Sequence, residues 1–173
     1  MSNDEWLTPR SLVRALGSFD LDPCAPVTRP WKTAKRHYTI YDNGLIQPWH
    51  GRVWLNPPYG SQTKLWLRKL RRHGDGIALI FVRTDSAWFF RQVWNSAYAV
   101  LFLRGRLQFH HLDGTAAPHS AGVPSCLVAY GDHNVRALQS IGIPGKLILL
   151  RNFAGSLGTT RNPQNQSSAE LED

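Results

Sequence analysis

Short apolar runs alternate with amphipathic stretches along most of the chain, which is the pattern of an α/β protein. The clearest run, 77–82, contains no polar residue and predicts a strand that is buried on both faces. Other segments predict further strands at 19–22, 53–55, 98–103, 106–109, 125–130 and 146–150. The alternation of strands and helices predicts an open α/β sheet with helices on its faces.

Helices are predicted between these strands, where apolar residues recur at helical spacing. The first helix is predicted to follow Thr8, whose hydroxyl can cap it, with Pro9 in its first turn and Gly17 at its end. We expect Thr84 or Asp85 to cap a later helix. The later helices are predicted at 63–72, 87–95 and 134–140. The apolar residues of the helix over 63–72 are Leu65, Trp66, Leu67 and Leu70.

A chain of 173 residues with 42% hydrophobic residues is expected to form one domain with a sizeable core. We predict that this domain covers residues 1–154, with irregular segments at 25–43 and 112–123. From residue 155 onward Gly, Ser, Thr, Asn and Gln dominate. This composition predicts a disordered tail over 155–173.

The net charge of +8, with a pI near 10.0, indicates a polyanionic partner, and nucleic acid is the first candidate. The tail over 155–173 carries one arginine against three acidic residues, so the charge of the preceding residues is +10. The alternative is a basic protein whose charge serves only solubility.

A cytoplasmic protein without a bound metal is expected. No run of about 18 apolar residues suggests a membrane span, and segment 2–5 is polar and acidic, unlike a signal peptide. Cys24 and Cys126 lie far apart in the chain and suit a reducing compartment rather than structural zinc. His110-His111 with His119 fits no standard metal-binding spacing.

Asn56-Pro57-Pro58-Tyr59 is the most informative motif, because it directly follows the predicted strand over 53–55. An exocyclic amino group on a base is a poor nucleophile, since its lone pair is delocalised into the ring. The Asn56 side-chain oxygen can accept one N–H of such a group, and the Pro57 carbonyl, held in place by the two prolines, can accept the other. Tyr59 can lie flat against the ring. The alternative is a rigid turn with an aromatic plug.

Two aspartates are further candidates, because ligands of open α/β sheets bind beyond the carboxyl ends of the strands. Asp22, before Pro23, ends the strand over 19–22 and suits an ammonium group or ribose hydroxyls. Asp42 could accept a hydrogen bond from an adenine amino group. For both aspartates, an Asx turn that serves only the local backbone is an equal alternative.

A run of basic residues follows the Asn56 motif: Lys64, Arg68, Lys69, Arg71 and Arg72. Such a run on a helix is often only a solvated face. Its position beside the predicted site favours contacts with DNA phosphates. Arg104 and Arg106 follow the end of a predicted strand and could also contact DNA.

The chain resembles the phage-type Dam family of DNA N-6-adenine methyltransferases in four segments that occur in the same order. They are Asp4-Glu5-Trp6-Leu7-Thr8-Pro9, Phe19-Asp20-Leu21-Asp22-Pro23-Cys24-Ala25, Asp42-Asn43-Gly44-Leu45 with Trp49, and Trp54-Leu55-Asn56-Pro57-Pro58-Tyr59-Gly60. A less specific fit at 121–126 extends the resemblance to about residue 130. Asn-Pro-Pro-Tyr is typical of amino-group methyltransferases as a class, whereas the first two segments narrow the resemblance to this family.

The resemblance implies a Rossmann-like methyltransferase fold, with a single mixed sheet and flanking helices, and S-adenosylmethionine as cofactor. The implied contacts of the cofactor are Trp6, Thr8 and Pro9 at its methionine part, Asp22 and Pro23 near its ribose or amino group, Asp42 at its adenine, and Asn56. The implied contacts of the target adenine are Asn56, Pro57, Pro58 and Tyr59. Methyltransferases usually carry a glycine-rich loop after the first strand, and this chain has no glycine there.

We therefore expect direct transfer of a methyl group from S-adenosylmethionine to the amino group of an adenine that has left the DNA stack. A bacteriophage or prophage origin, a bacterial host cytoplasm and protection of DNA from restriction go with the resemblance. One alternative is methylation of another amine, in cytosine, RNA adenine or protein glutamine. A second is a catalytically silent DNA-binding module, which the absent glycine loop would favour.

Overall fold

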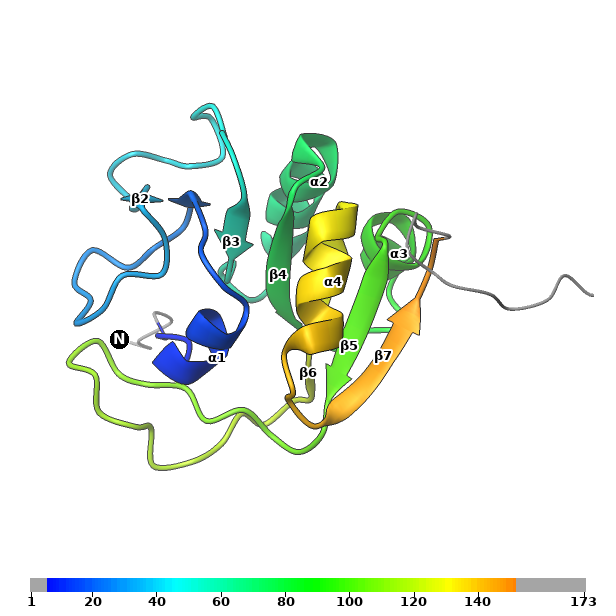
Figure 1. The fold of residues 1–173 in the computed structure, drawn as a ribbon. Coiled ribbons are helices and arrows are strands. Elements are labelled where there is room, and N and C mark those ends of the chain that lie inside the picture. The colour runs from blue at the N-terminus through cyan, green and yellow to red at the C-terminus, as the bar shows by residue number, and fades with distance from the viewer. Residues whose placement is uncertain (1–5, 152–173) are drawn as a thin grey trace, which may run out of the picture.

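The computed structural model describes residues 6–151, which form one seven-stranded sheet and the helices that cover it (Figure 1). The predicted tail over 155–173 and the predicted domain limit at residue 154 lie outside the described residues. The strands are β1 (Leu21–Asp22), β2 (Arg36–His37), β3 (Val53–Leu55), β4 (Gly76–Phe81), β5 (Ala99–Leu103), β6 (Ser125–Tyr130) and β7 (Gly145–Leu149). The helices are α1 (Arg10–Ala15), α2 (Thr63–His73), α3 (Ala87–Phe89), its π-helical continuation η1 (Phe90–Trp94), and α4 (Asp132–Ser140).

The sheet is mixed, with the strand order β2-β1-β3-β4-β6-β5-β7. The strands β2, β1, β3 and β4 run parallel, whereas β6 is antiparallel to both of its neighbours and β7 is antiparallel to β5. The predicted mixed α/β sheet is thus confirmed. The chain leaves β1 for the edge strand β2 and then returns to β3, on the other side of β1. Such a reversal of strand order opens a crevice at the carboxyl ends of the strands, where ligands bind.

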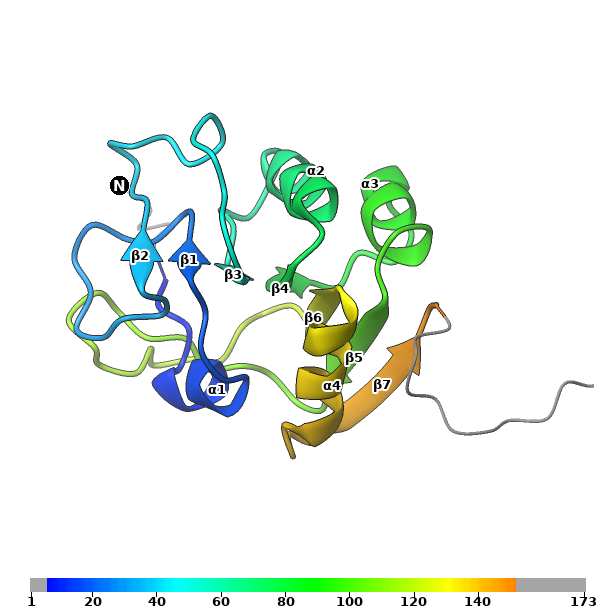
Figure 2. The same cartoon turned by 45° about the horizontal axis from the view of Figure 1, so that its top comes forward.

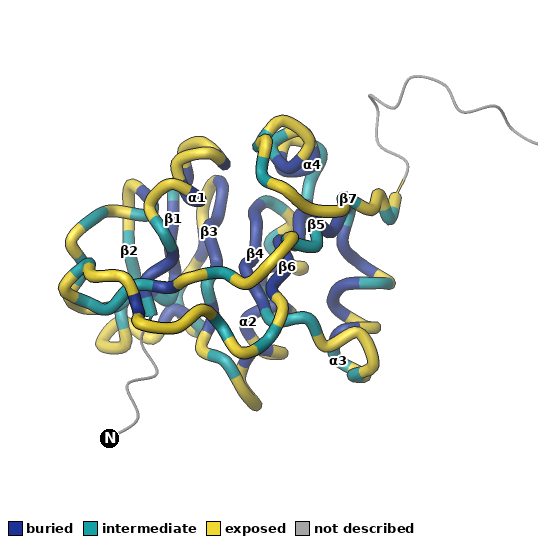
Figure 3. Tube along the Cα trace, turned by 90° about the horizontal axis from the view of Figure 1, so that it is seen from below, coloured by how far each residue is buried: buried dark blue, intermediate teal, exposed yellow. Residues whose placement is uncertain are grey.

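Helices cover both faces of the sheet (Figure 2). On one face, Leu12 of α1 and Val135 of α4 share a core with Trp54. On the other face, Leu67 of α2 packs in a second core with Leu55. The consecutive residues of β3 thus point to opposite cores, as the period of two in a strand requires, and buried residues concentrate along the central strands (Figure 3). No helix in the described part of the chain has the length and hydropathy of a membrane span.

A buried arginine joins three of these elements. The Arg52 side chain donates through Nε to Asn134 Oδ1 at 2.7 Å and through Nη1 to the carbonyls of Leu16 and Ser18 at 3.0 and 2.9 Å. Its guanidinium also lies 4.2 Å from the centre of the Phe19 ring. Arg52 therefore ties the end of α1 and the approach to β1 to α4.

The start of α1 differs from the prediction. The helix begins at Arg10, Pro9 occupies its N-cap position, and no side chain caps it. An isolated β-bridge between Leu7 and His110 holds the preceding segment, and Thr8 is only 2% exposed. The hydroxyl of Thr8 is therefore buried rather than used as a cap.

Two details of the later helices also differ. Ser86 caps α3, because its hydroxyl accepts a hydrogen bond from the Phe89 N–H at 3.4 Å, so the prediction of Thr84 or Asp85 was wrong. Leu65 of α2 is 43% exposed and lies outside both cores.

Two strand predictions need correction. The strand β2 lies within the segment predicted to be irregular, and no strand forms over 106–109. Gly105, with a φ of 81°, turns the chain after β5. The carbonyls of Leu107 and Phe109 then accept hydrogen bonds from Ala121 and Ala117 in the following loop. This segment therefore pairs with a loop and not with the sheet.

Candidate active site

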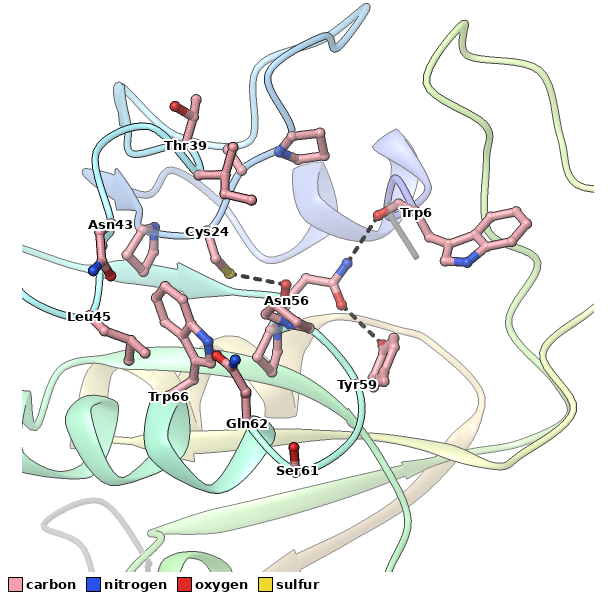
Figure 4. Close-up of a pocket in the computed structure, with 17 residues that line it drawn as sticks. Trp6, Cys24, Thr39, Asn43, Leu45, Asn56, Tyr59, Ser61, Gln62 and Trp66 are labelled. Atoms are coloured by element: carbon pink, nitrogen blue, oxygen red, sulfur yellow. Dashed lines mark hydrogen bonds between the residues drawn. The ribbon is translucent and has the colours of Figure 1, made fainter. Parts of the chain in front are cut away.

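A cavity of ≈ 540 Å³, which we call the strand-end cavity, opens at the carboxyl ends of β1 and β3, beside the strand-order reversal (Figure 4). Its walls are Trp6, residues 23–26 after β1, parts of the loop 39–45, and the Asn56 motif with the beginning of α2. None of these lining residues is charged. Within residues 6–151, no three His, Cys, Asp or Glu side chains form a group that could hold a metal ion.

The Asn56 side-chain amide is held at the wall of this cavity by two hydrogen bonds (Figure 4). Its Nδ2 donates to the Trp6 carbonyl at 3.3 Å, and its Oδ1 accepts from the Tyr59 hydroxyl at 3.0 Å. Because a carbonyl can only accept, the Trp6 contact determines which end of the amide is the oxygen. Asn56 Oδ1 retains the capacity to accept a second hydrogen bond.

The backbone of the motif is held equally firmly. The Asn56 carbonyl accepts from the Cys24 thiol at 3.1 Å, and the Pro58 carbonyl accepts from the Thr63 hydroxyl at 2.8 Å. These contacts connect the ends of β1 and β3 with the first residue of α2. Within residues 6–151 no group donates to the Pro57 carbonyl, so this oxygen can accept from a ligand.

A second cavity, which we call the aromatic cavity, adjoins the first. It measures ≈ 420 Å³, and its walls are Trp6, Tyr59, Phe81, Phe109 and the loop 117–122. The rings of Tyr59 and Phe81 are stacked, with centroids 3.8 Å apart and planes inclined by 11°. Phe109 meets both rings edge-on at 6.2 and 6.5 Å. Trp6 and Tyr59 belong to the walls of both cavities.

Asp22 is buried and does not line the strand-end cavity. Its carboxylate accepts hydrogen bonds from the Thr33 hydroxyl and from the Cys24 N–H at 3.2 Å. Burial raises the pKa of Asp22 from 3.8 to about 6, although both hydrogen bonds act in the opposite direction. The next residue, Pro23, does line the cavity.

Asp42 is exposed and serves its own loop. Its Oδ2 accepts from the N–H and the hydroxyl of Thr39 at 2.7 and 2.9 Å, and these hydrogen bonds lower the pKa of Asp42. The carboxylate thereby fixes the turn from which Asn43 and Gly44 reach the wall of the strand-end cavity.

The predicted site residues therefore divide into two groups. All four residues predicted to hold the target adenine line the strand-end cavity: Asn56, Pro57, Pro58 and Tyr59. Of the residues predicted to hold the cofactor, Trp6, Pro23 and Asn56 line it. Outside the lining are Thr8, Pro9, Asp22 and Asp42.

Lys69, predicted to contact DNA, instead fixes one wall of the strand-end cavity. Its ammonium donates to the carbonyls of Gly44 and Leu45 at 3.0 and 2.7 Å, and also to that of Gln47. It lies 5.0 Å from the centre of the Trp49 ring, whose Nε1 donates to the Gly44 carbonyl at 2.8 Å. These contacts attach the loop to α2.

The other six residues predicted to contact DNA are exposed, and within residues 6–151 none of them forms an ion pair. On α2 they are Lys64, Arg68, Arg71 and Arg72. Arg104 and Arg106 lie in the turn after β5.

Sequence reasoning did not single out three aromatic residues at the site. Trp66, assigned only to the apolar set of a helix, is 7% exposed and lines the strand-end cavity. Phe81 and Phe109 build the aromatic cavity. Two of them could have been predicted from their positions in the sequence, because Trp66 lies in the first helical turn after the Asn56 motif and Phe81 ends a neighbouring strand.

The family model of DNA N-6-adenine-methyltransferase (Dam) matches residues 1–141. This chain belongs to the Dam family. The match spans every residue that lines the two cavities. As its description states, the family consists of enzymes that methylate adenine in DNA. The predicted resemblance to Dam is thus confirmed, whereas its phage type stays a prediction. No curated protein and no solved structure matches the chain.

Asp22→Asn is predicted to remove a pH dependence of stability. Because the pKa of Asp22 is about 6 in the folded protein against an ordinary 3.8, the folded protein binds this proton more tightly than the unfolded chain. Its contribution to the free energy of unfolding should fall as pH rises through this interval, by at most about 3 kcal/mol. Urea denaturation of wild type and variant between about pH 4 and pH 7 measures the difference. Parallel pH curves would contradict the prediction.

Lys69→Met should mainly lower the stability of the fold, whereas Arg68→Met should mainly weaken the binding of DNA. Lys69→Met loses three hydrogen bonds to one loop, so it should lower the free energy of unfolding by about 2 kcal/mol. The exposed Arg68→Met should change stability by less than about 0.5 kcal/mol but reduce the salt slope of DNA binding by about one. Urea denaturation and DNA titrations at several salt concentrations measure both effects. Equal stability of the two variants would refute the structural role of Lys69.

Proposed function

We propose that this chain transfers the methyl group of S-adenosylmethionine directly to the exocyclic amino group of an adenine held outside the DNA duplex stack. The observation that carries the proposal is the position of Asn56. Its side-chain oxygen lies at the wall of the strand-end cavity and accepts a hydrogen bond from Tyr59, which belongs to the walls of both cavities. The two cavities offer separate places for a methyl donor and a methyl acceptor.

The residues of the strand-end cavity fit the cofactor. Its volume of ≈ 540 Å³ is in the range of small-molecule sites, and its lining combines apolar side chains with the amides of Asn43, Asn56 and Gln62. When bound, S-adenosylmethionine supplies an electrophilic methyl group. Trp6, Pro23 and Asn56 are the predicted residues that would hold it from this lining.

The aromatic cavity fits a base. Its four aromatic residues provide flat apolar surfaces, on which a base can stack with a gain of about 1–3 kcal/mol. That gain offsets part of the cost of a few kcal/mol for removing the base from the duplex. Because Phe81 already covers one face of Tyr59, an incoming base would stack on the ring surfaces that remain exposed in the aromatic cavity.

Asn56 and Pro57 act on the amino group of the base. The free acceptor capacity of Asn56 Oδ1 takes one N–H, and the Pro57 carbonyl takes the other. Two acceptors draw the amino nitrogen toward a pyramidal geometry, in which its lone pair leaves the ring system and becomes nucleophilic. The N–C bond would form as the C–S bond of the donor breaks, with S-adenosylhomocysteine as the leaving group and one amino proton released to solvent. The Tyr59 hydroxyl and the Trp6 carbonyl hold the amide in this orientation, so the protein contributes mainly positioning.

Among the alternatives, the family description favours adenine in DNA over cytosine, RNA adenine or protein glutamine. The net charge of +8 also favours a nucleic acid over a protein substrate. The proposed setting is the cytoplasm of a bacterial host, and protection of phage or prophage DNA from restriction is the proposed role; these parts rest on the resemblance of the sequence alone.

Asn56→Ala is predicted to lower methyl transfer to DNA by at least about 1,000-fold, because it removes one of the two acceptors for the amino group. Cofactor binding should weaken far less, because Trp6 and Pro23 remain in the lining. Methylation of a plasmid from a host without adenine methylation measures the transfer, and single-molecule sequencing identifies the base. Calorimetry measures the binding of S-adenosylmethionine. The exposed Asn95→Ala is the matched control. Transfer by Asn56→Ala would refute the mechanism, and absence of cofactor binding by wild type would favour the silent module.

Tyr59→Phe keeps the ring but removes the hydroxyl that donates to Asn56. We expect kcat to fall by about 5–10-fold, which corresponds to one hydrogen bond of about 1 kcal/mol, with little change in KM for DNA. Steady-state kinetics separates the two parameters. Tyr41→Phe, at a residue that is 85% exposed, is the control. A change confined to KM would show that the hydroxyl binds DNA instead of orienting Asn56.

A further inference from the structure

The indole of Trp66 is an unused hydrogen-bond donor at the strand-end cavity. Trp66 lies in the first turn of α2 and is 7% exposed. Its ring stacks with that of Trp49, with centroids 6.3 Å apart and planes inclined by 21°. Within the part of the chain that the structure describes, its Nε1 is buried and has no hydrogen-bond partner.

A buried donor without an acceptor is costly, and most such groups in proteins have partners. An indole N–H can only donate, so Trp66 can be satisfied only by an acceptor. Of the described residues with a buried and unpaired side-chain N or O, Trp66 is the one that lines the strand-end cavity. Figure 4 shows the indole nitrogen on the side of the ring that faces Asn56 and Gln62. A ligand in the cavity is therefore the candidate acceptor for this donor.

The lining of the cavity indicates the chemistry of that acceptor. No lining residue is charged, and the unpaired donor at this end of the cavity is the neutral indole N–H, which a neutral acceptor satisfies. Leu45 and the Trp66 ring provide apolar surfaces at this end of the cavity (Figure 4). A flat, neutral heterocycle with a ring nitrogen matches both the apolar surfaces and the single donor.

The position of Asn56 indicates which part of the ligand this is. In Figure 4, Trp66 and Trp6 lie on opposite sides of Asn56. The transferable methyl group must lie at Asn56 if this residue holds the acceptor amine. The two parts of S-adenosylmethionine that extend from its sulfur would then lie toward Trp66 and toward Trp6, and the nucleoside part is the one with a heterocycle.

We propose that the Trp66 indole N–H donates a hydrogen bond to a ring nitrogen of the adenine of the bound methyl donor. Trp66 is thus a cofactor-binding residue that also selects an acceptor atom on the base. This inference rests on the proposed function, because it names a further contact of the same cofactor.

Trp31 offers a matched control within the chain. Its Nε1 is also buried and unpaired, but Trp31 does not line the strand-end cavity. Trp→Phe at either position removes an unsatisfied donor and keeps an aromatic ring. If both nitrogens were merely tolerated defects, the two variants would behave alike toward ligand.

The experiment is calorimetric titration of the full chain with S-adenosylhomocysteine, which binds without reacting. Trp66→Phe should weaken binding by about 3–10-fold, the effect of one neutral hydrogen bond, and Trp31→Phe should leave it unchanged. The midpoint of thermal unfolding without ligand should not fall by more than a few degrees in Trp66→Phe, since no hydrogen bond is lost from the free protein. A purely structural role predicts the reverse, with a lower unfolding midpoint and unchanged affinity.

Analogues that lack one ring nitrogen test the same bond without relying on the variant. The 1-deaza, 3-deaza and 7-deaza forms of S-adenosylhomocysteine each remove one acceptor of adenine. One of them should lose the same factor on wild type and lose nothing further on Trp66→Phe. Equal losses on both proteins for all three analogues would overturn the inference and leave the proposed function intact. No binding of the parent compound by wild type would overturn both.

Discussion

The parallel pairing of β1 with β3 sets the register on which the candidate site depends. Leu21 pairs with Val53, and the Arg52 carbonyl accepts from the N–H of Leu21 at 3.3 Å. This register brings Cys24 next to Asn56, where the thiol donates to the Asn56 carbonyl. A shift by one residue would turn every side chain of β3 to the opposite face. The geometry of the amide thus follows from the pairing of two very short strands, of which β3 also pairs with the longer β4.

The sequence predicts the parts of this arrangement that depend on continuous apolar runs. The runs over 77–82 and 125–130 became β4 and β6, and the Asn-Pro-Pro-Tyr motif lies at a strand end as expected. Neither β2 nor the burial of Arg52 could be predicted. Arg36-His37 has no apolar signal, and an arginine such as Arg52, directly before a strand, is usually exposed unless distant carbonyls accept its N–H groups. The partners Leu16, Ser18 and Asn134 become visible only in the fold.

The contacts of long and of short polar side chains differ in how far the sequence predicts them. The side chains of Arg68 and Lys69 are neighbours in one basic run, yet one is exposed and the other reaches three carbonyls of a loop. Sequence shows the charge of such a residue but not the direction of its flexible chain. The carboxylates of Asp22 and Asp42 are short, and nearby hydroxyls occupy them. The hydrogen bond from the Cys24 N–H to Asp22 has the spacing of the Asx turn considered from the sequence, whereas Asp42 accepts from Thr39, which precedes it.

The position of β6 has a consequence for how the molecule is assembled. This strand lies between β4 and β5, although it follows both in the chain. During synthesis β4 and β5 therefore lack their common neighbour until Tyr130 has emerged, and Arg52 lacks one acceptor until Asn134 follows. The strand β4, which ends at Phe81, is thus made early but gains its second neighbour late, whereas β3, which leads into the Asn56 motif, pairs only with β1 and β4. A segment that lines neither cavity thus decides when the strand behind the aromatic cavity is complete.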